Sequence, residues 1–483
     1  MKLKINSTII LLIFIFILTL AFRLYFTFQS NNLNGDDAYF HLRHIESITR
    51  GDFVYYDDLS YGGRYIIYPP IFHLVMALLT FGNLFLLKLI PEILLASVVF
   101  IGFLLSKEIT KNDNVSLISA LFSGFVPLFL VETVNGLSVY SFVMPLILLA
   151  IYSFMDLNKR IKLFLFVISL LALVHLSAFL VIISLGFYFL LLVGENMKLD
   201  RLEKEVILFT LIIIFLFSFI IYKKAFLEYG IGIISQGIPS NLASDYFRDI
   251  NILDLIIGVG ILPLIFGSYG VFSGVREKNK GLHLINGFIF SIFLLLVFRL
   301  IEFYIGIMFL GIFLAITSSI GLLRLSDYIE NTKIANVKLL FSLGLIILVA
   351  VLMIMPVSGL LNKKGFIHDQ SIHDLEWIKE NSKEDSVVLS LLNEGHLINS
   401  LANRKNVIDD NFLLAKDPVK RLEDVNLIYS TGSEAIALDL IYKYDINYIY
   451  FSDDAKRLYN ELKYAGNEKC FKKARSRVYE ILC

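Results

Sequence analysis

The chain is a succession of long apolar segments separated by short polar turns. The first segment, 1–28, has a basic start and then a bulky apolar run without a small-residue cleavage site. We therefore expect an uncleaved membrane anchor with its N-terminus inside. Because a spanning helix needs about 17–25 mostly apolar residues, the pattern predicts about 11–13 spans. After the anchor, they are expected near 89–106, 115–131, 139–155, 161–178, 179–193, 205–222, 252–273, 281–298, 299–322 and 338–358.

Two regions depart from this pattern. The region 29–88 is predicted to be a large outer loop, whose apolar stretch 66–83 begins with Tyr-Pro-Pro and forms a half-buried helix. Beyond residue 361 the chain becomes polar, and helix-like pieces alternate with strand-like pieces, which is typical of an α/β domain. We expect a multi-span domain at 1–361 and an external α/β domain at 362–483. Its predicted helices are 372–380 and 433–444, and its predicted strands are 386–390, 406–408, 446–451 and 477–482.

Composition restricts the class of protein. Hydrophobic residues make up 57% of the 483 residues, charged residues only 18%, and the mean hydropathy is +0.72. A soluble protein of this size does not need so much apolar surface, so the fold class is mostly α, a polytopic helical membrane protein. The formal net charge of zero argues against a nucleic-acid partner.

The positions of Lys and Arg predict the orientation in the cell membrane. The predicted inner loops are basic, whereas the short outer turns at 132–138 and near 178 hold neither Lys nor Arg. One exception is the predicted outer loop 223–251, which carries Lys223, Lys224 and Arg248. This asymmetry predicts a cytoplasmic N-terminus and an external C-terminal domain. Outside the cell, Cys470 and Cys483 could form a disulfide.

A pair of carboxylates, Asp36 and Asp37, follows the first span and begins an amphipathic stretch rich in aromatic residues and His. Charges held at a bilayer surface could bind a divalent cation or act as a base toward a lipid-borne substrate. The alternative is a solvated cap on an outer amphipathic helix. Similarly, His41 and His44 lie on one helix face, where a metal role or a solvated face is conceivable.

Three stretches carry a resemblance to a known family. They are 36–43 (DDAYFHLR), 64–70 (RYIIYPP) and 386–409 in the C-terminal region. With the single anchor, the many spans and the outer α/β domain, the chain resembles the catalytic subunit of oligosaccharyltransferase, particularly its archaeal form. More broadly it resembles the GT-C membrane glycosyltransferases. The resemblance covers most of the chain and implies the GT-C fold.

The chain departs from the family at three motifs. The WWDYG signature is reduced to LLNEG at 391–395, and Leu cannot bond to the hydroxyl of an acceptor Asn-X-Ser/Thr sequon. The second acidic motif is represented by Glu132 alone. In the loop where the family has a Ser-X-X-Glu-type motif, the nearest candidate is the neutral Gln236. The acceptor is therefore expected to be other than, or looser than, the usual sequon.

The resemblance implies sugar transfer from a polyprenyl phosphate or pyrophosphate donor to a protein or glycan acceptor. The leaving phosphate needs a cation, and a carboxylate must orient or deprotonate the acceptor. We expect Asp36 and Asp37 to be catalytic and, with Glu132, to bind Mg²⁺ or Mn²⁺, with Asn135 or His41 completing the ligands. Adjacent residues project differently, and Asp36 is favoured as the one facing the site.

Further residues are expected to contact substrate or lipid. Arg299 and Glu302 lie at the outer end of a predicted span, where an intramembrane charge is a functional candidate, although the two could form a structural ion pair. Glu132 could be an ordinary loop acid. We expect His175 to be interfacial, and Glu394 and His396 to lie in a surface turn. The expected substrate-binding residues are Tyr68, His41, Arg43, Gln236, Arg299 and Glu302.

Three functional hypotheses remain from the sequence. The first is a GT-C glycosyltransferase acting on the external face of a prokaryotic, by resemblance archaeal, cell membrane. The second is a non-catalytic relative that binds or scaffolds an envelope glycan machine, as the degenerate motifs suggest. The third, a secondary transporter, is disfavoured because no pair of interrupted spans recurs in matching halves.

Overall fold

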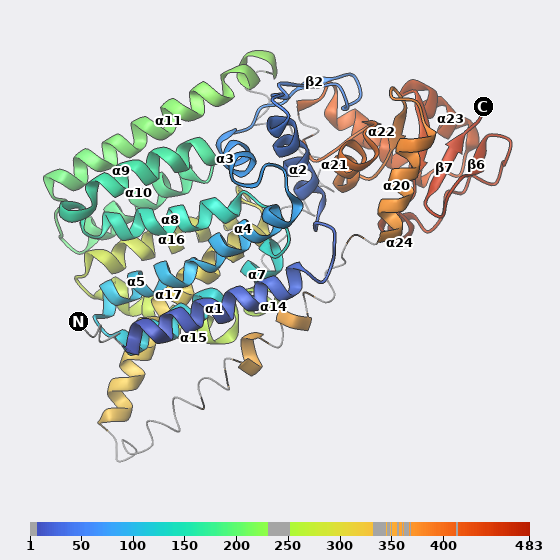
Figure 1. Ribbon diagram of the computed structural model, residues 1–483. Helices are drawn as coiled ribbons and strands as arrows, with labels where there is room; N and C mark the ends of the chain where they lie inside the picture. Colours follow the sequence, from blue (N-terminus) through green and yellow to red (C-terminus); the bar gives the residue numbers. More distant parts are fainter. Residues whose placement is uncertain are drawn as a thin grey trace.

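The computed structural model describes residues 7–229, 252–331, 369–411 and 414–483, together with 344, 348, 350–354, 357–359, 361 and 367. A large helical domain and a smaller domain containing a sheet lie at opposite ends of the molecule (Figure 1). The helical domain consists of α1 (Ser7–Thr27), α4 (Leu84–Ala96), α5 (Val98–Thr110), α6 (Asp113–Gly124), α7 (Pro127–Thr133), α8 (Tyr140–Phe154), α9 (Leu157–Val174), α10 (Ala178–Gly194), α11 (Arg201–Tyr229), α14 (Ile252–Val259), α15 (Ile261–Arg276), α16 (Lys280–Val297) and α17 (Phe303–Glu330).

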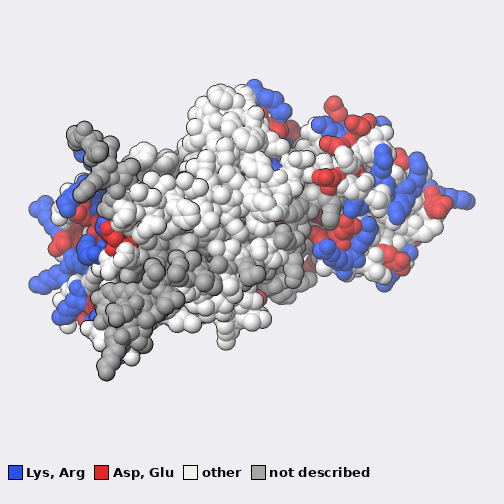
Figure 2. Space-filling model, turned by 60° about the horizontal axis from the view of Figure 1, so that its bottom comes forward, with Lys and Arg blue, Asp and Glu red and all other residues white. Residues whose placement is uncertain are grey.

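The helical domain is that of a multi-pass membrane protein. Among the described residues, five helical stretches are long and apolar enough to cross a bilayer, or up to seven if two bent pairs each count as one span. Lys and Arg, Asp and Glu gather at the two ends of the molecule, and a wide belt without them covers the helical domain on the face shown in Figure 2. The most apolar stretch of α17 is almost entirely buried against its neighbours, whereas the last turns of this helix are partly exposed.

The number of spans found by length and composition is smaller than the expected 11–13. Several predicted spans are helices that are short or begin with charges: α8 has 15 residues, and α9 carries Lys159, Arg160 and Lys162 in its first turns. The span predicted near 252–273 is interrupted in the structure, because Gly260, at a φ of 88°, separates α14 from α15, and the two helices meet at 98°. Most of the predicted span at 338–358 lies outside the described residues.

The C-terminal domain is an α/β domain, as predicted. Its five strands are ordered β4-β3-β5-β7-β6, with β3 parallel to β4 and β5, and with β7 antiparallel to β5 and β6. Cys470 and Cys483 form a disulfide beside β6 and β7. The elements are α20 (Asp369–Asn381), β3 (Val387–Leu389), α21 (Gly395–Leu397), β4 (Lys405–Asn406), α22 (Pro418–Ser430), α23 (Glu434–Lys443), β5 (Ile446–Tyr450), α24 (Asp453–Tyr459), β6 (Phe471–Lys473) and β7 (Val478–Ile481).

The two faces of this sheet pack against different partners. Successive strand residues point to opposite faces. Val387 and Leu389 therefore join an apolar cluster with α22 and α23. Val388 packs with α20 and with Ile45 of the region 29–88, which keeps the name first outer loop from the predicted topology. The sheet is thus covered on one side by its own helices and on the other partly by a segment that lies more than 300 residues earlier in the chain.

The first outer loop contains α2 (Asp36–Thr49), β1 (Tyr56–Asp57), β2 (Arg64–Tyr65) and α3 (Ile71–Thr80). Helix α3 is the half-buried helix predicted for 66–83. The loop also extends the edge of the C-terminal sheet, because the Asn406 amide donates to the Leu59 carbonyl at 2.8 Å and the Tyr61 amide donates to the Asn406 carbonyl at 2.9 Å. These contacts hold the loop against the α/β domain.

Candidate active site

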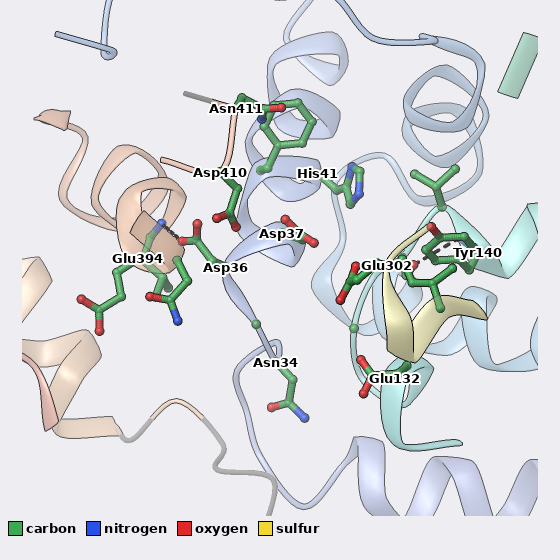
Figure 3. A pocket seen from close by; sticks show the side chains of 18 of the residues that line it. Asn34, Asp36, Asp37, His41, Glu132, Tyr140, Glu302, Glu394, Asp410 and Asn411 are labelled. Carbon is green, nitrogen blue, oxygen red and sulfur yellow. Dashed lines mark hydrogen bonds between the residues drawn. The ribbon is translucent and has the colours of Figure 1, made fainter. Parts of the chain in front are cut away.

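A cavity of about 730 Å³ lies where the helical domain, the first outer loop and the C-terminal domain meet. All three parts contribute carboxylates to its wall (Figure 3). The outer loop supplies Asp36 and Asp37, and the helical domain supplies Glu132 and Glu302. The C-terminal domain contributes Glu394, Asp410, Asp453 and Asp454. Asp36, Asp37, Glu132 and Glu302, all candidate site residues from the sequence, thus line one cavity.

The two adjacent aspartates occupy different environments. Because consecutive helix residues project about 100° apart, Asp36 at the start of α2 points to the C-terminal domain while the exposed Asp37 faces the cavity (Figure 3). The Asp36 carboxylate accepts the amide N–H groups of Leu397 at 2.7 Å and His396 at 3.1 Å. The sequence favoured Asp36 as the residue that faces the site, but in this structure its two oxygens are engaged by the backbone.

The electrostatics of Asp36 also differ from those of an ordinary surface aspartate. Burial, followed by the neighbouring charge of Asp410, raises the pKa of the Asp36 carboxyl well above its usual value. The two amide donors act in the opposite direction but do not offset burial. Asp36 therefore holds a proton more readily than a solvated aspartate and is poorly suited to be a permanent anionic ligand.

The helical domain presents its two carboxylates from helix ends. Glu132 is in the last turn of α7, and Glu302 precedes the first residue of α17. Arg299 lies in the turn between α16 and α17, with a left-handed φ of 54°, and it is exposed and does not line the cavity. The structure thus brings Glu302, but not Arg299, to the site. Gln236 lies outside the described residues.

Three histidines of the first outer loop form an aromatic cluster beside the cavity. His41 Nδ1 lies 2.8 Å from His73 Nε2, and the buried His44 ring packs against Phe40 and Tyr68, with centroids 4.4 and 4.7 Å apart. His41, His73 and Tyr68 line the cavity. Burial and neighbouring charges lower the pKa of His41 to about 3 and those of His44 and His73 well below the usual value, so the three rings are neutral.

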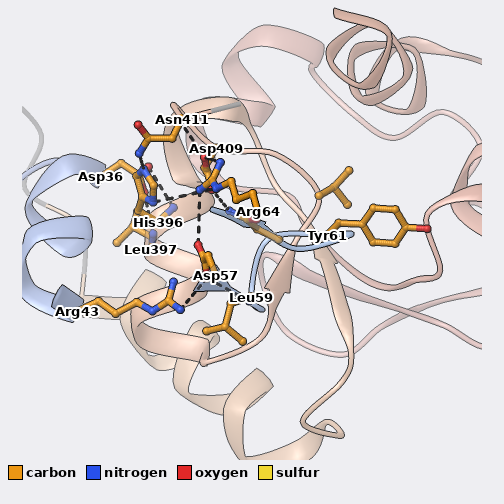
Figure 4. A network of polar contacts seen from close by, with 12 residues as sticks. Asp36, Arg43, Asp57, Leu59, Tyr61, Arg64, His396, Leu397, Asp409 and Asn411 are labelled. Carbon is orange, nitrogen blue, oxygen red and sulfur yellow. Dashed lines mark hydrogen bonds and ion pairs between the residues drawn. The ribbon is translucent and has the colours of Figure 1, made fainter. Parts of the chain in front are cut away.

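Arg43 has a structural partner rather than an open position. Its guanidinium donates to Asp57 Oδ1 at 2.8 Å, and Asp57 also faces Arg64, which forms a two-bond ion pair with Asp409 (Figure 4). Although burial opposes ionisation of Asp409, the charge of Arg64 and hydrogen bonds from Arg64 and Asn406 lower its pKa below the usual value. Arg64 was noticed only as part of a motif, and its role was missed.

The prediction of a surface turn at Glu394 and His396 is wrong. Both side chains are buried, and His396 lies 4.0 Å from Asp409 and 3.2 Å from the Asn411 amide nitrogen. Burial raises the pKa of Glu394 to about 7. A Cβ on Gly395 would lie 2.3 Å from the Ile408 carbonyl oxygen, which explains why the one glycine shared with the family motif is needed here. Sequence alone offers no signal for this burial, since the contacts are long-range.

The cavity offers the ligand atoms that a hard divalent cation prefers, but these atoms are not arranged as a metal site. The carboxylates of Asp37, Glu132 and Glu302 provide the oxygen donors that Mg²⁺ and Mn²⁺ prefer. Within the described part of the chain, however, no three His, Cys, Asp or Glu side chains are arranged to hold a metal ion. The donor types therefore fit a divalent cation, but the expected set of Asp36, Asp37 and Glu132 does not form a metal site as the side chains stand.

The apolar spanning helices, the first outer loop and the α/β domain over a shared cavity have the arrangement of the GT-C fold. No family model and no curated protein matches the chain. Among solved structures, the chain is similar to the oligosaccharyltransferase AglB of Archaeoglobus fulgidus in its apo form, with a TM-score of 0.71 and 15% identity over 93% of this chain and 70% of that chain. The likeness confirms the fold that the sequence resemblance implied.

Further structures of the same archaeal protein match with TM-scores of 0.64 to 0.70 and 14–15% identity, covering 91–99% of this chain and 69–74% of that chain. They hold an inhibitory peptide with a dolichol-phosphate, a tethered acceptor peptide with the NVT sequon, and Zn with sulfate. ArnT of Cupriavidus metallidurans bound to undecaprenyl phosphate matches with a TM-score of 0.57 and 13% identity, over 92% of this chain and 96% of that chain.

Proposed function

We propose that this protein is a membrane glycosyltransferase that transfers a sugar or an oligosaccharide from a polyprenyl-linked phosphate or pyrophosphate donor to an acceptor on the external face. The observation that carries the proposal is the convergence of Asp37, Glu132 and Glu302, from two separate parts of the chain, on one cavity at the outer end of the spanning helices. The lipid phosphates held by AglB and ArnT support the donor class.

The cavity carboxylates have two tasks in such a reaction. Asp37 is exposed to the cavity and can accept a proton from, or orient, the acceptor nucleophile. Glu132 and Glu302 lie on the wall formed by the helical domain, where a membrane-borne phosphate arrives, and carboxylates there repel a phosphate unless a cation intervenes. A bound Mg²⁺ or Mn²⁺ would supply that positive charge and stabilise the leaving phosphate.

The acceptor differs from the usual sequon in this proposal. At the position of the family signature, Leu391 is buried and Leu392 packs against the core of the α/β domain, so neither offers a hydrogen bond to an acceptor hydroxyl. Asn393 and Glu394 of the same segment do line the cavity. These two side chains can form hydrogen bonds with polar groups of a protein or glycan acceptor. They do not replace the Trp and Asp of the family signature, which bind the Ser or Thr hydroxyl of the sequon.

The proposed orientation has the N-terminus in the cytoplasm and the C-terminal domain outside. The basic inner loops and the Cys470–Cys483 disulfide support it, since disulfides persist mainly in oxidising compartments. The likeness to AglB favours an archaeal envelope and protein glycosylation. A role as a non-catalytic binding or scaffold subunit is the alternative, and the two leucines in place of the signature tryptophans favour it.

The test is transfer from a radiolabelled pool of polyprenyl-linked glycans in native membranes, with and without EDTA, for the wild type and Asp37→Asn. We expect metal-dependent transfer that the substitution abolishes. Asp58→Asn, an exposed aspartate of the same outer loop, is the matched control and retains transfer. Unchanged transfer by a folded Asp37→Asn protein overturns the proposed site. Absence of transfer by the folded wild type from every pool favours the non-catalytic alternative.

A further inference from the structure

A charged pair is completely buried at the outer end of the helical domain. Arg23 of α1 and Glu92 of α4 are 0% and 1% exposed, and Arg23 Nε lies 2.6 Å from Glu92 Oε2. The same guanidinium donates from Nη2 to Thr133 Oγ1 at 2.9 Å. The pair therefore connects the first span and α4 to the residue that directly follows Glu132.

The second oxygen of Glu92 continues the connection beyond α7. Glu92 Oε1 accepts the backbone N–H of Asn135 at 2.8 Å and the Thr27 hydroxyl at 3.0 Å. Asn135 adopts a left-handed φ of 57°. This hydrogen bond fixes the turn through which the chain leaves Glu132.

The turn at Asn135 is also hydrogen-bonded to the segment that leads to Asp37. The Asn135 side chain donates to the Asn32 carbonyl at 2.8 Å, and the amide of Asn34 donates to the Asn135 carbonyl at 2.9 Å. From α4, the ammonium group of Lys88 donates to the carbonyls of Ser30 at 2.7 Å and Asn32 at 3.0 Å. These hydrogen bonds connect the two acidic segments through Asn135 and through the buried charges of α1 and α4.

Stability alone does not account for such a pair. Desolvation of two charges can exceed their mutual attraction, so replacing a buried ion pair by apolar residues of similar volume is often neutral or stabilising. What apolar residues cannot supply are the directional bonds to Thr133 and Asn135. We propose that Arg23 and Glu92 are positioning residues that set the spacing between the Asp37 segment and the Glu132 segment. The role of the pair in setting this spacing does not depend on the proposed function. The effect of the spacing on catalysis rests on the proposed function.

The spacing can be measured by the dipolar broadening of continuous-wave electron spin resonance spectra, which suits segments in direct contact. The nitroxide labels are placed at Asn31→Cys, an exposed position before Asp37, and at Ser138→Cys, after Glu132. The two natural cysteines are paired, so only the introduced thiols react. In the otherwise wild-type chain we expect one narrow distance distribution. Adding Arg23→Met with Glu92→Met removes the pair without leaving a lone buried charge, and we expect a broader or shifted distribution in a protein that still unfolds cooperatively.

The matched control is Arg160→Met with Glu108→Met. This carboxylate–guanidinium pair, 2.6 Å apart, lies at the opposite end of α9 from the cavity, and its removal leaves the distance distribution unchanged. A narrow, unshifted distribution in the Arg23/Glu92 variant overturns the proposal. So does a distribution that broadens equally in the control.

Kinetics without the labels then test the catalytic consequence. A misplacement of about 1 Å at a reacting group can cost about 100-fold in rate, so we expect kcat to fall by that order in the Arg23→Met/Glu92→Met protein, with KM for the donor nearly unchanged. Arg23→Met with Glu92→Gln retains an acceptor for the Asn135 amide without leaving a lone buried charge, and it recovers part of the rate. A changed distance with unchanged kcat overturns the catalytic consequence. A wild type without transfer refutes the proposed function and leaves the distance result standing.

Discussion

Arg64 and Asp409 form a two-bond ion pair across 345 residues of sequence, with Nη1 2.6 Å from Oδ1 and Nη2 2.5 Å from Oδ2. The side chains are 3% and 0% exposed, and Asp57 lies 3.6 Å from the same guanidinium. The pair joins the first outer loop to the C-terminal domain next to the cavity. The two parts that carry Asp37 and Asp410 are therefore held together by buried charge as well as by backbone hydrogen bonds.

Breaking this pair from one side should be strongly destabilising. Arg64→Met leaves Asp57 and Asp409 buried without their common cation, and such a loss costs about 3–5 kcal/mol. We expect a lower Tm of the purified protein in detergent and earlier proteolytic cleavage within the first outer loop. Arg457→Met, which removes an exposed partner of Asp454, should change Tm little; an equal loss in both variants contradicts the structural role of Arg64.

Substitution of Asp36 should destabilise the protein, whereas substitution of the adjacent Asp37 should not. Asp36→Ala leaves two buried amide N–H groups without an acceptor, which costs about 1–3 kcal/mol, whereas Asp37→Ala exposes no new polar group. We expect thermal unfolding to show a lower Tm for Asp36→Ala and a wild-type Tm for Asp37→Ala. Equal Tm values for the two variants would show that the contact between Asp36 and α21 contributes nothing to folding.

Gly395 should tolerate no side chain. A Cβ would lie 2.3 Å from the Ile408 carbonyl oxygen and 2.4 Å from the Asp409 Cβ, and overpacking of this kind costs about 1–3 kcal/mol. We expect Gly395→Ala to lower the free energy of unfolding of the α/β domain, measured by denaturant titration. Gly466→Ala in the same domain is the control, because open space surrounds its Cβ position. Indistinguishable stabilities would refute the close approach.

The buried histidines should make stability depend on pH. Burial, followed by the charge of Arg43, lowers the pKa of His44 well below its usual value, so between the unfolded value near 6.5 and the folded value the unfolded state binds more protons. The contribution of neutral His44 to the free energy of unfolding is complete above about pH 6.5. It falls by at most about 1.4 kcal/mol per pH unit as the pH decreases. Within the described residues, neither His44 ring nitrogen has a hydrogen-bond partner, so His44→Phe should be tolerated.

The comparison of wild type and His44→Phe isolates that group. Their Tm values should be similar at pH 7.5, and the variant should become the more stable protein at pH 5.5. Taking the difference removes the contributions of Asp36 and Glu394, whose raised pKa values act with the opposite sign. His373→Phe, at an exposed ring, should show no such crossover. A pH-independent difference for His44→Phe contradicts a buried neutral ring.

Local patterns predicted most elements of the fold. Hydropathy located the helices of the membrane domain, and alternation of helix-like and strand-like pieces predicted α20, β3, α23, β5 and β7 close to their observed positions. The bend at Gly260 was missed because both α14 and α15 are apolar, so hydropathy is continuous through the break. The edge strand β6 was not predicted, because it has only three residues and two of them are lysines.

The sequence identified site residues only where a family motif or a charge at the end of a predicted span indicated them. The motif resemblance indicated Asp37 and Glu132, the charge at the end of a predicted span indicated Glu302, and all three line the cavity. It did not distinguish Asp36 from Asp37, because the difference depends on amides 360 and 361 residues away. His396 was assigned to a surface turn for the same reason: its burial comes from Asp409, Asn411 and the first outer loop, none of which is visible in its local sequence.

The pairing of Arg64 with Asp409 also has a consequence for biogenesis. At about 5–20 residues per second, the ribosome needs about 20–70 s to add the 345 residues that separate them. During that time the helices of the helical domain that follow α1 are made, while Arg64 in the first outer loop has no Asp409 with which to pair. Contacts so distant in sequence form late and slowly. We therefore expect the α/β domain to dock on the first outer loop late in folding, and this docking completes the wall of the cavity.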